Sequence, residues 1–158
     1  MESNYLQELE KAYRSTTNIG YMTSTCVIVY GLVTYGILKS QKFLHDPVQA
    51  PYLKWLFLML SVGTLASIPI LKNTFLEKAS FQTVEEFIKK LQSYSIVIFA
   101  LCESIAVYGL ALALMTKNMN DYYWLGGLSL IAFIYMFPKY EKWEEWLKSR
   151  TFGAGSGH

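Results

Sequence analysis

The sequence predicts an all-α, polytopic membrane protein in which four transmembrane helices form two repeated hairpins. Hydrophobic residues make up 53% of the 158 residues and charged residues 16%, whereas an ordinary soluble domain is roughly 25% charged. Four apolar runs approach the ~20 residues that a helix needs to cross a bilayer. We expect one domain over residues 1–152, followed by a GAGSGH tail at 153–158 that is typical of a tag remnant.

Charges and breakers set the bounds of the four runs. The first ends at Lys39, and Pro69 near the end of the second predicts a kink. The fourth opens on an aromatic pair followed by Trp124, typical of a membrane-interface belt, and stops at Pro138. The expected spans are 19–38, 52–71, 92–116 and 122–137, with the aromatic belt at Tyr122, Tyr123 and Trp124.

The third span is expected to begin before the membrane. Thr83 followed by Glu86 is a capping-box signature, and the apolar residues from Val84 to Leu91 have helical spacing. No Gly or Pro lies between this segment and the start of the third span, and the helix can continue to Lys117. We therefore predict one helix about 50 Å long, which exceeds the ~30 Å hydrocarbon core.

Basic residues predict that both termini are cytoplasmic. Ten of them lie in the N-terminal, central and C-terminal polar segments, and four lie on the other side, at Lys39, Lys42, Lys54 and Lys117. The cytoplasmic side then receives three amphipathic segments, which either lie in the headgroup layer or form a collar that recruits a partner. Their apolar residues are Tyr5, Leu6, Leu9 and Tyr13, then those of 84–91, then Tyr140, Trp143, Trp146 and Leu147.

A short internal repeat underlies the prediction of two hairpins. TCVIVYGL at 25–32 aligns with ESIAVYGL at 103–110, and a lysine follows seven residues after each, at Lys39 and Lys117. Four identities in eight apolar positions also arise by chance. In this alignment Thr25 occupies the place of Glu103, so only the second copy carries an acid.

Glu103 is the main functional clue. It falls near the middle of the third span, where desolvation disfavours the charged form of a carboxyl. Because no basic residue lies near the middle of any span, a neutral or ion-bound carboxyl is expected rather than a salt bridge. The candidate hydrogen-bond partners are the hydroxyls of Ser104, Thr25, Ser24, Tyr30, Tyr108, Ser61 and Thr64.

The segment FALCESIAVYGLALAL, from Phe99 to Leu114, resembles the carboxylate-bearing helix of the proteolipid (c-type) subunits of rotary V- and F-type ATPases. In that family an acid followed a few residues later by Tyr-Gly-Leu carries the transported proton or sodium ion. The resemblance implies that Glu103 is the ion carrier. Ser104, Tyr108 and Thr25, from among the candidate hydrogen-bond partners, complete the predicted ion-binding set. The family's acid lies on the second helix of a hairpin, whereas Glu103 falls on the first helix of the second one.

Two functions remain open at this point. The first is an oligomeric protein, or a subunit of a membrane complex, that binds or moves protons or monovalent cations through Glu103. The second is a non-transporting scaffold or assembly protein in which Glu103 fixes helix packing. No catalytic, metal-binding or cofactor-binding motif is present, and the scattered basic residues do not predict a nucleic-acid partner. Membrane lipid is the partner common to both hypotheses.

Overall fold

The computed structural model describes residues 2–40, 51–77 and 83–153, and within these ranges every regular element is a helix. The rest of the expected tag remnant, 154–158, lies outside the described residues, as do the expected loop residues Lys42 and Pro47. The elements are α1 (Glu2–Ser40), α2 (Pro51–Lys72), a π-helical turn η1 (Asn73–Glu77), α3 (Val84–Thr116), α4 (Met119–Met136) and α5 (Tyr140–Gly153). The all-α prediction is confirmed.

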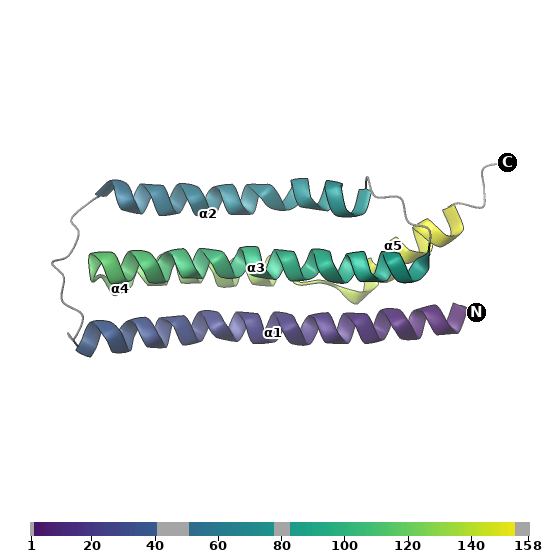
Figure 1. Cartoon of the computed structure of the whole chain (residues 1–158), viewed down its shortest axis with the longest axis horizontal. Helices are drawn as coiled ribbons and strands as arrows, with labels where there is room; N and C mark the ends of the chain where they lie inside the picture. The colour runs from purple at the N-terminus through teal and green to yellow at the C-terminus, as the bar shows by residue number, and fades with distance from the viewer. Residues whose placement is uncertain (1, 41–50, 78–82, 154–158) are drawn as a thin grey trace.

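Helix α3 is the centre of the molecule. In Figure 1, α2 and α1 flank it on opposite sides, while α4 runs antiparallel to it and contacts it along its length. The start of α1 and the whole of α5 lie at the same end of the bundle (Figure 1), which we call the terminal end; the opposite end is the loop end. The α3–α4 turn lies at the loop end, and α5 extends the bundle at the terminal end (Figure 1).

The prediction of two repeated hairpins is not confirmed. α3 and α4 pack closely, but the described parts of α1 and α2 make no contact with each other because α3 lies between them. The first pair of helices is therefore not a packed unit like the second. Helix α1 instead packs on α3 and α4.

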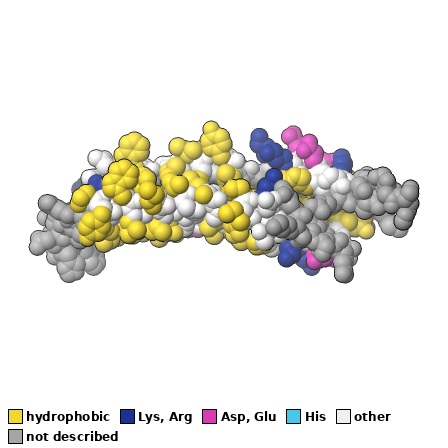
Figure 2. All heavy atoms as spheres, turned by 90° about the horizontal axis from the view of Figure 1, so that it is seen from above, with side chains coloured by type: hydrophobic (Ala, Val, Ile, Leu, Met, Phe, Trp, Pro, Cys, Tyr) yellow, Lys and Arg dark blue, Asp and Glu magenta, His cyan; other side chains and the backbone are white. Residues whose placement is uncertain are grey.

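Three helices are long and apolar enough to cross a membrane: the helical stretches at 5–40, 51–76 and 84–116. Figure 2 shows apolar side chains covering most of the length of the bundle, with basic and acidic side chains gathered near one end. Exposed apolar side chains on α1 and α2, such as Met22 and Trp55, are 72% and 66% accessible. Such faces suit lipid, so the prediction of a membrane protein is supported at the level of its helices.

The predicted start of α3 is confirmed. Thr83 is the N-cap, and its hydroxyl accepts a hydrogen bond of 3.2 Å from the backbone N–H of Glu86. The helix then runs without a break to Thr116 and ends at Lys117, whose φ of 53° is left-handed. α2 also continues through Pro69 to Lys72.

A glycine permits a close approach between α3 and α4, whereas the glycine of α2 lies against no neighbour. A Cβ added at Gly109 would lie 2.9 Å from the Cβ of Leu125, whereas one added at Gly63 would meet nothing within 4 Å. Glycine is therefore needed at position 109 for the approach of α4. The sequence analysis placed the aromatic belt at 122–124, but Tyr122 is 5% exposed, while Tyr123 and Trp124 are 60% and 81% exposed.

Gly109→Ala should destabilise the bundle because the new methyl group would overlap Leu125 across the α3–α4 contact. The expected cost in the free energy of unfolding, relative to the control, is about 1 to 3 kcal/mol. Gly127→Ala is the matched control, since a Cβ there meets nothing within 4 Å. Unfolding by SDS in mixed micelles measures both variants, and equal stabilities would contradict this account of Gly109.

Candidate functional site at Glu103

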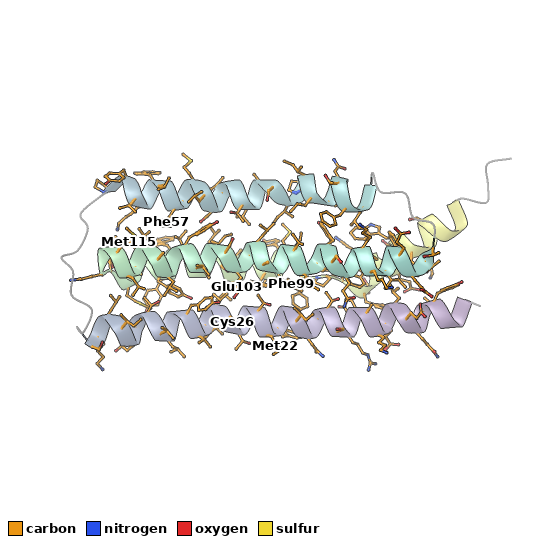
Figure 3. All side chains as sticks on the ribbon, in the orientation of Figure 1. Met22, Cys26, Phe57, Phe99, Glu103 and Met115 are labelled. Carbon is orange, nitrogen blue, oxygen red and sulfur yellow. The ribbon has the colours of Figure 1, made fainter. Side chains whose placement is uncertain are left out.

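Glu103 is partly buried on the side of α3 that faces α1 (Figure 3). The hydroxyl of Tyr30 on α1 donates a hydrogen bond of 2.6 Å to its Oε1. Within the described residues, Oε2 accepts no hydrogen bond and no cation lies within ion-pair distance. The site is therefore a carboxyl on a helix that is long and apolar enough to cross a membrane, with one hydroxyl partner among the described residues.

Two more hydrogen bonds lie near Glu103 along the bundle and connect α1 and α3 to α4. Ser129 on α4 donates to the backbone carbonyl of Cys102 on α3 at 2.6 Å. The hydroxyl of Tyr122 on α4 donates to the carbonyl of Val27 on α1. With Tyr30 and Glu103, these bonds link α1 to α3, α3 to α4 and α4 to α1. The carboxyl thus belongs to a closed set of three interhelical hydrogen bonds, which we call the mid-bundle triangle.

Aromatic packing closes the terminal side of this site. Phe99, one turn before Glu103, has its ring centroid 5.9 Å from that of Phe133 and 5.8 Å from that of Phe137. A Cβ at Gly20 would lie 2.7 Å from the Phe99 ring, so glycine at this position of α1 leaves room for the ring. The carboxyl is therefore separated from the terminal end by a packed aromatic layer.

The other predicted ion-binding residues do not converge on Glu103. Thr25 is exposed and donates to the carbonyl of Tyr21, and Ser104 donates to the carbonyl of Leu101. The ring of Tyr108 faces α2, with its centroid 6.1 Å from that of Phe57. Of the seven candidate hydroxyl partners, Tyr30 alone contacts the carboxyl, because Ser and Thr in a helix readily bond carbonyls of their own preceding turn.

The three remaining candidates, on serine and threonine side chains, also form hydrogen bonds within their own helices. Ser24, Ser61 and Thr64 each donate to a carbonyl three or four residues earlier on the same helix. Ion binding by Glu103, Ser104, Tyr108 and Thr25 stays a prediction. Within the described residues, the side chain that hydrogen-bonds to the Glu103 carboxyl is Tyr30.

The sequence analysis missed an ion pair at the loop end. Lys54 on α2 donates to Asp121 Oδ1 at 2.7 Å, and Thr116 donates to Asp121 Oδ2 at 2.6 Å. The Asp121 side chain is only 8% exposed, and Lys54 is 49% exposed. Asn118 caps α4 and places Asp121 in the first turn of this helix. This pair ties α2 to the α3–α4 turn.

The three amphipathic segments meet at the terminal end. Their apolar residues pack together into a second core, the terminal-end cluster, made of Leu9, Leu76, Phe87, Ile88, Leu91, Trp143 and Leu147. α1 runs unbroken through the first segment, so this segment is not a separate helix lying flat on the membrane. The three segments pack against one another, and their position relative to the membrane stays a prediction.

Tyr13 joins α1 to α5 within this region. Its hydroxyl donates to the carbonyl of Pro138 at 3.1 Å, and its ring makes edge contacts with Tyr140 and Trp143 at 5.4 and 5.6 Å between centroids. Burial, helped by the carboxylates of Glu144 and Glu10, raises the pKa of Tyr140 above its ordinary value. The phenol therefore stays neutral, which suits an apolar cluster.

Comparison of the chain with protein-family models, curated proteins and solved structures finds no match. Within the described ranges, no three His, Cys, Asp or Glu side chains gather closely enough to hold a metal ion. The candidate site accordingly rests on the geometry around Glu103.

Tyr30→Phe should lower the free energy of unfolding by about 0.5 to 1.5 kcal/mol, because it removes one interhelical hydrogen bond. In a Glu103→Leu background the same change should cost close to nothing, since the acceptor is already gone. The double-mutant cycle in mixed micelles measures this difference. Tyr35→Phe, on an exposed side chain of α1, is the control; equal costs of Tyr30→Phe in both backgrounds would refute the pairing.

Proposed function

We propose that the chain is a membrane-anchored scaffold or assembly protein whose terminal end forms a rigid cytoplasmic docking platform. The observation that carries this proposal is the terminal-end cluster, a second packed core beyond the apolar part of the bundle. Leu9 and Leu91 are 0% exposed and Trp143 is 2% exposed, so α1, α3 and α5 are held together there. A protein that serves only to anchor itself in a membrane does not need a second packed core such as the terminal-end cluster.

In this proposal the chain crosses the membrane four times with both termini in the cytoplasm. α4 has 18 residues, about 27 Å, and lies antiparallel against α3, so a membrane that contains α3 also surrounds α4. The excess of basic residues in the N-terminal, central and C-terminal polar segments favours this orientation. Glu103 then acts structurally, as the acceptor that fastens α1 to α3.

The platform requires α5 to be docked. Trp143→Ala should release α5, because removal of a buried aromatic side chain costs about 3 to 5 kcal/mol. Hydrogen exchange across residues 140–149 should become faster, while exchange across 96–113 should not change. Trp124→Ala is the control, since this side chain is 81% exposed at the loop end. Unchanged exchange in α5 would contradict the rigid platform.

A partner is sought with a photo-crosslinking amino acid at Lys142, an exposed position of α5. In native membranes it should yield one discrete adduct that mass spectrometry identifies. The adduct should disappear in the Trp143→Ala protein and persist in Glu103→Gln. Absence of a discrete adduct, or one that survives Trp143→Ala, argues against a docking platform.

Proton or monovalent-cation handling by an oligomer is the second candidate. The observation in its favour is that Glu103 Oε2 has no hydrogen-bond partner in the described residues and that the side chain is only partly buried. A carboxyl held on one oxygen by Tyr30 can exchange a proton or an ion through the other. One subunit of four helices does not enclose a wide pore, so transport requires several copies.

Glu103→Gln separates the two candidates. The amide oxygen still accepts from Tyr30, so the fold should survive, but glutamine releases no proton. Under the scaffold proposal, proteoliposomes with either protein show the same background ion flux and the adduct at position 142 is unaffected. Flux in wild type that falls to background in Glu103→Gln, with unfolding unchanged, would instead establish ion handling.

A further inference from the structure

A cavity of about 410 Å³ opens between the terminal ends of α1 and α3. Six of its eight lining residues are polar or charged, Ala12 and Ile88 are the other two, and its volume is in the range of small-ligand pockets. The lining residues are Glu8, Lys11, Ala12 and Ser15 from α1 and Glu85, Ile88, Lys89 and Gln92 from α3. Ile88 also belongs to the terminal-end cluster, so the cavity is built onto a packed core.

The charges of this cavity are balanced and available. Two lysines and two glutamates line it, one of each from each helix. Glu85 and Lys89 have the i,i+4 order that favours pairing along a helix. Nevertheless, in the part of the chain that the structure describes, none of the four charged side chains takes part in an ion pair. A ligand that carries one anion and one cation would find partners for both.

The cavity lies at the depth of the phospholipid headgroups. Of its polar lining residues, Ser15 lies four residues before the first expected span, which starts at Ile19, and Gln92 is the first residue of the third expected span. Four helical residues rise about 6 Å, similar to the thickness of one headgroup layer. The lining therefore meets the membrane where phosphate and amine groups are concentrated.

The surface that continues from the cavity suits an acyl chain. Met22 lies seven residues after Ser15 on the same face of α1 and is 72% exposed. Ile96 lies four residues after Gln92 on α3 and is 37% exposed. An apolar tail attached to a headgroup in the cavity can thus lie along accessible apolar side chains of both helices.

We propose that this cavity binds the headgroup of a phospholipid that carries both a phosphate and a primary ammonium, as in phosphatidylethanolamine. Lys11 and Lys89 would hold the phosphate, and Glu8 and Glu85 would accept hydrogen bonds from the ammonium. A choline headgroup has no N–H to donate, and a glycerol headgroup has no positive charge. The site does not involve Glu103 and does not depend on the function proposed above.

The test uses the full-length protein in detergent micelles and counts bound lipid by native mass spectrometry. The probes are dioleoyl-phosphatidylethanolamine, dioleoyl-phosphatidylglycerol, dioleoyl-phosphatidylcholine and, as free headgroup, glycerophosphoethanolamine. One molecule of the ethanolamine lipid should bind in preference to the other two lipids. Lys11→Gln with Lys89→Gln should weaken its binding by about tenfold or more.

The acidic pair tests the ammonium contact separately. Glu8→Gln with Glu85→Gln should abolish the preference for the ethanolamine over the glycerol headgroup while both lipids still bind. Matched controls are Lys139→Gln with Lys142→Gln and Glu141→Gln with Glu145→Gln, exposed pairs near or on α5 that do not line the cavity. The controls should bind like wild type.

Three results would overturn the proposal. Equal binding of the three lipids to wild type would remove the headgroup assignment. Equal losses in the cavity and control pairs would show general charge attraction at the terminal end. Binding of glycerophosphoethanolamine as tight as that of the intact lipid would identify a soluble ligand rather than a membrane lipid.

Discussion

In an apolar environment no water can replace a hydrogen bond that a polar side chain loses. The hydrogen bond from Tyr30 to Glu103 therefore constrains how α1 lies on α3. The same condition applies to Ser129 and Tyr122, whose hydroxyls donate to backbone carbonyls of neighbouring helices. The mid-bundle triangle therefore defines the packing of α1, α3 and α4. α2 is outside it and is held by apolar contacts and by Lys54 and Asp121.

The two ends of the bundle are stabilised by different physical means. At the loop end a largely buried carboxylate, Asp121, is satisfied by Lys54 and Thr116. At the terminal end the terminal-end cluster buries aromatic and aliphatic side chains of α1, η1, α3 and α5. Burial of apolar side chains drives the assembly of such a core wherever water reaches it, whereas lipid offers no such driving force between helices in a membrane. The charged cavity opens between the terminal ends of α1 and α3, and Ile88 belongs both to its lining and to the terminal-end cluster.

Several features could be read from local sequence alone. The all-α class, the apolar stretches and the continuous α3 follow from composition, helical spacing and the Thr83 cap, each of which depends on neighbours within a few residues. Glu103 was singled out because an acid in an apolar run is costly wherever it sits. Tyr30 was among its candidate partners, but sequence could not choose it over six other hydroxyls.

The choice was made in the tertiary structure, because the short Ser and Thr side chains satisfy themselves on their own helix and only the longer Tyr30 reaches across. Tertiary packing also inserted α3 between α1 and α2, buried Tyr122 and combined three separate amphipathic segments into one cluster. What the sequence by itself determined was which segments are helical and apolar. Which helix faces pack together depends on contacts between residues far apart in the chain. Helical periodicity depends on residues close in sequence and does not predict these contacts.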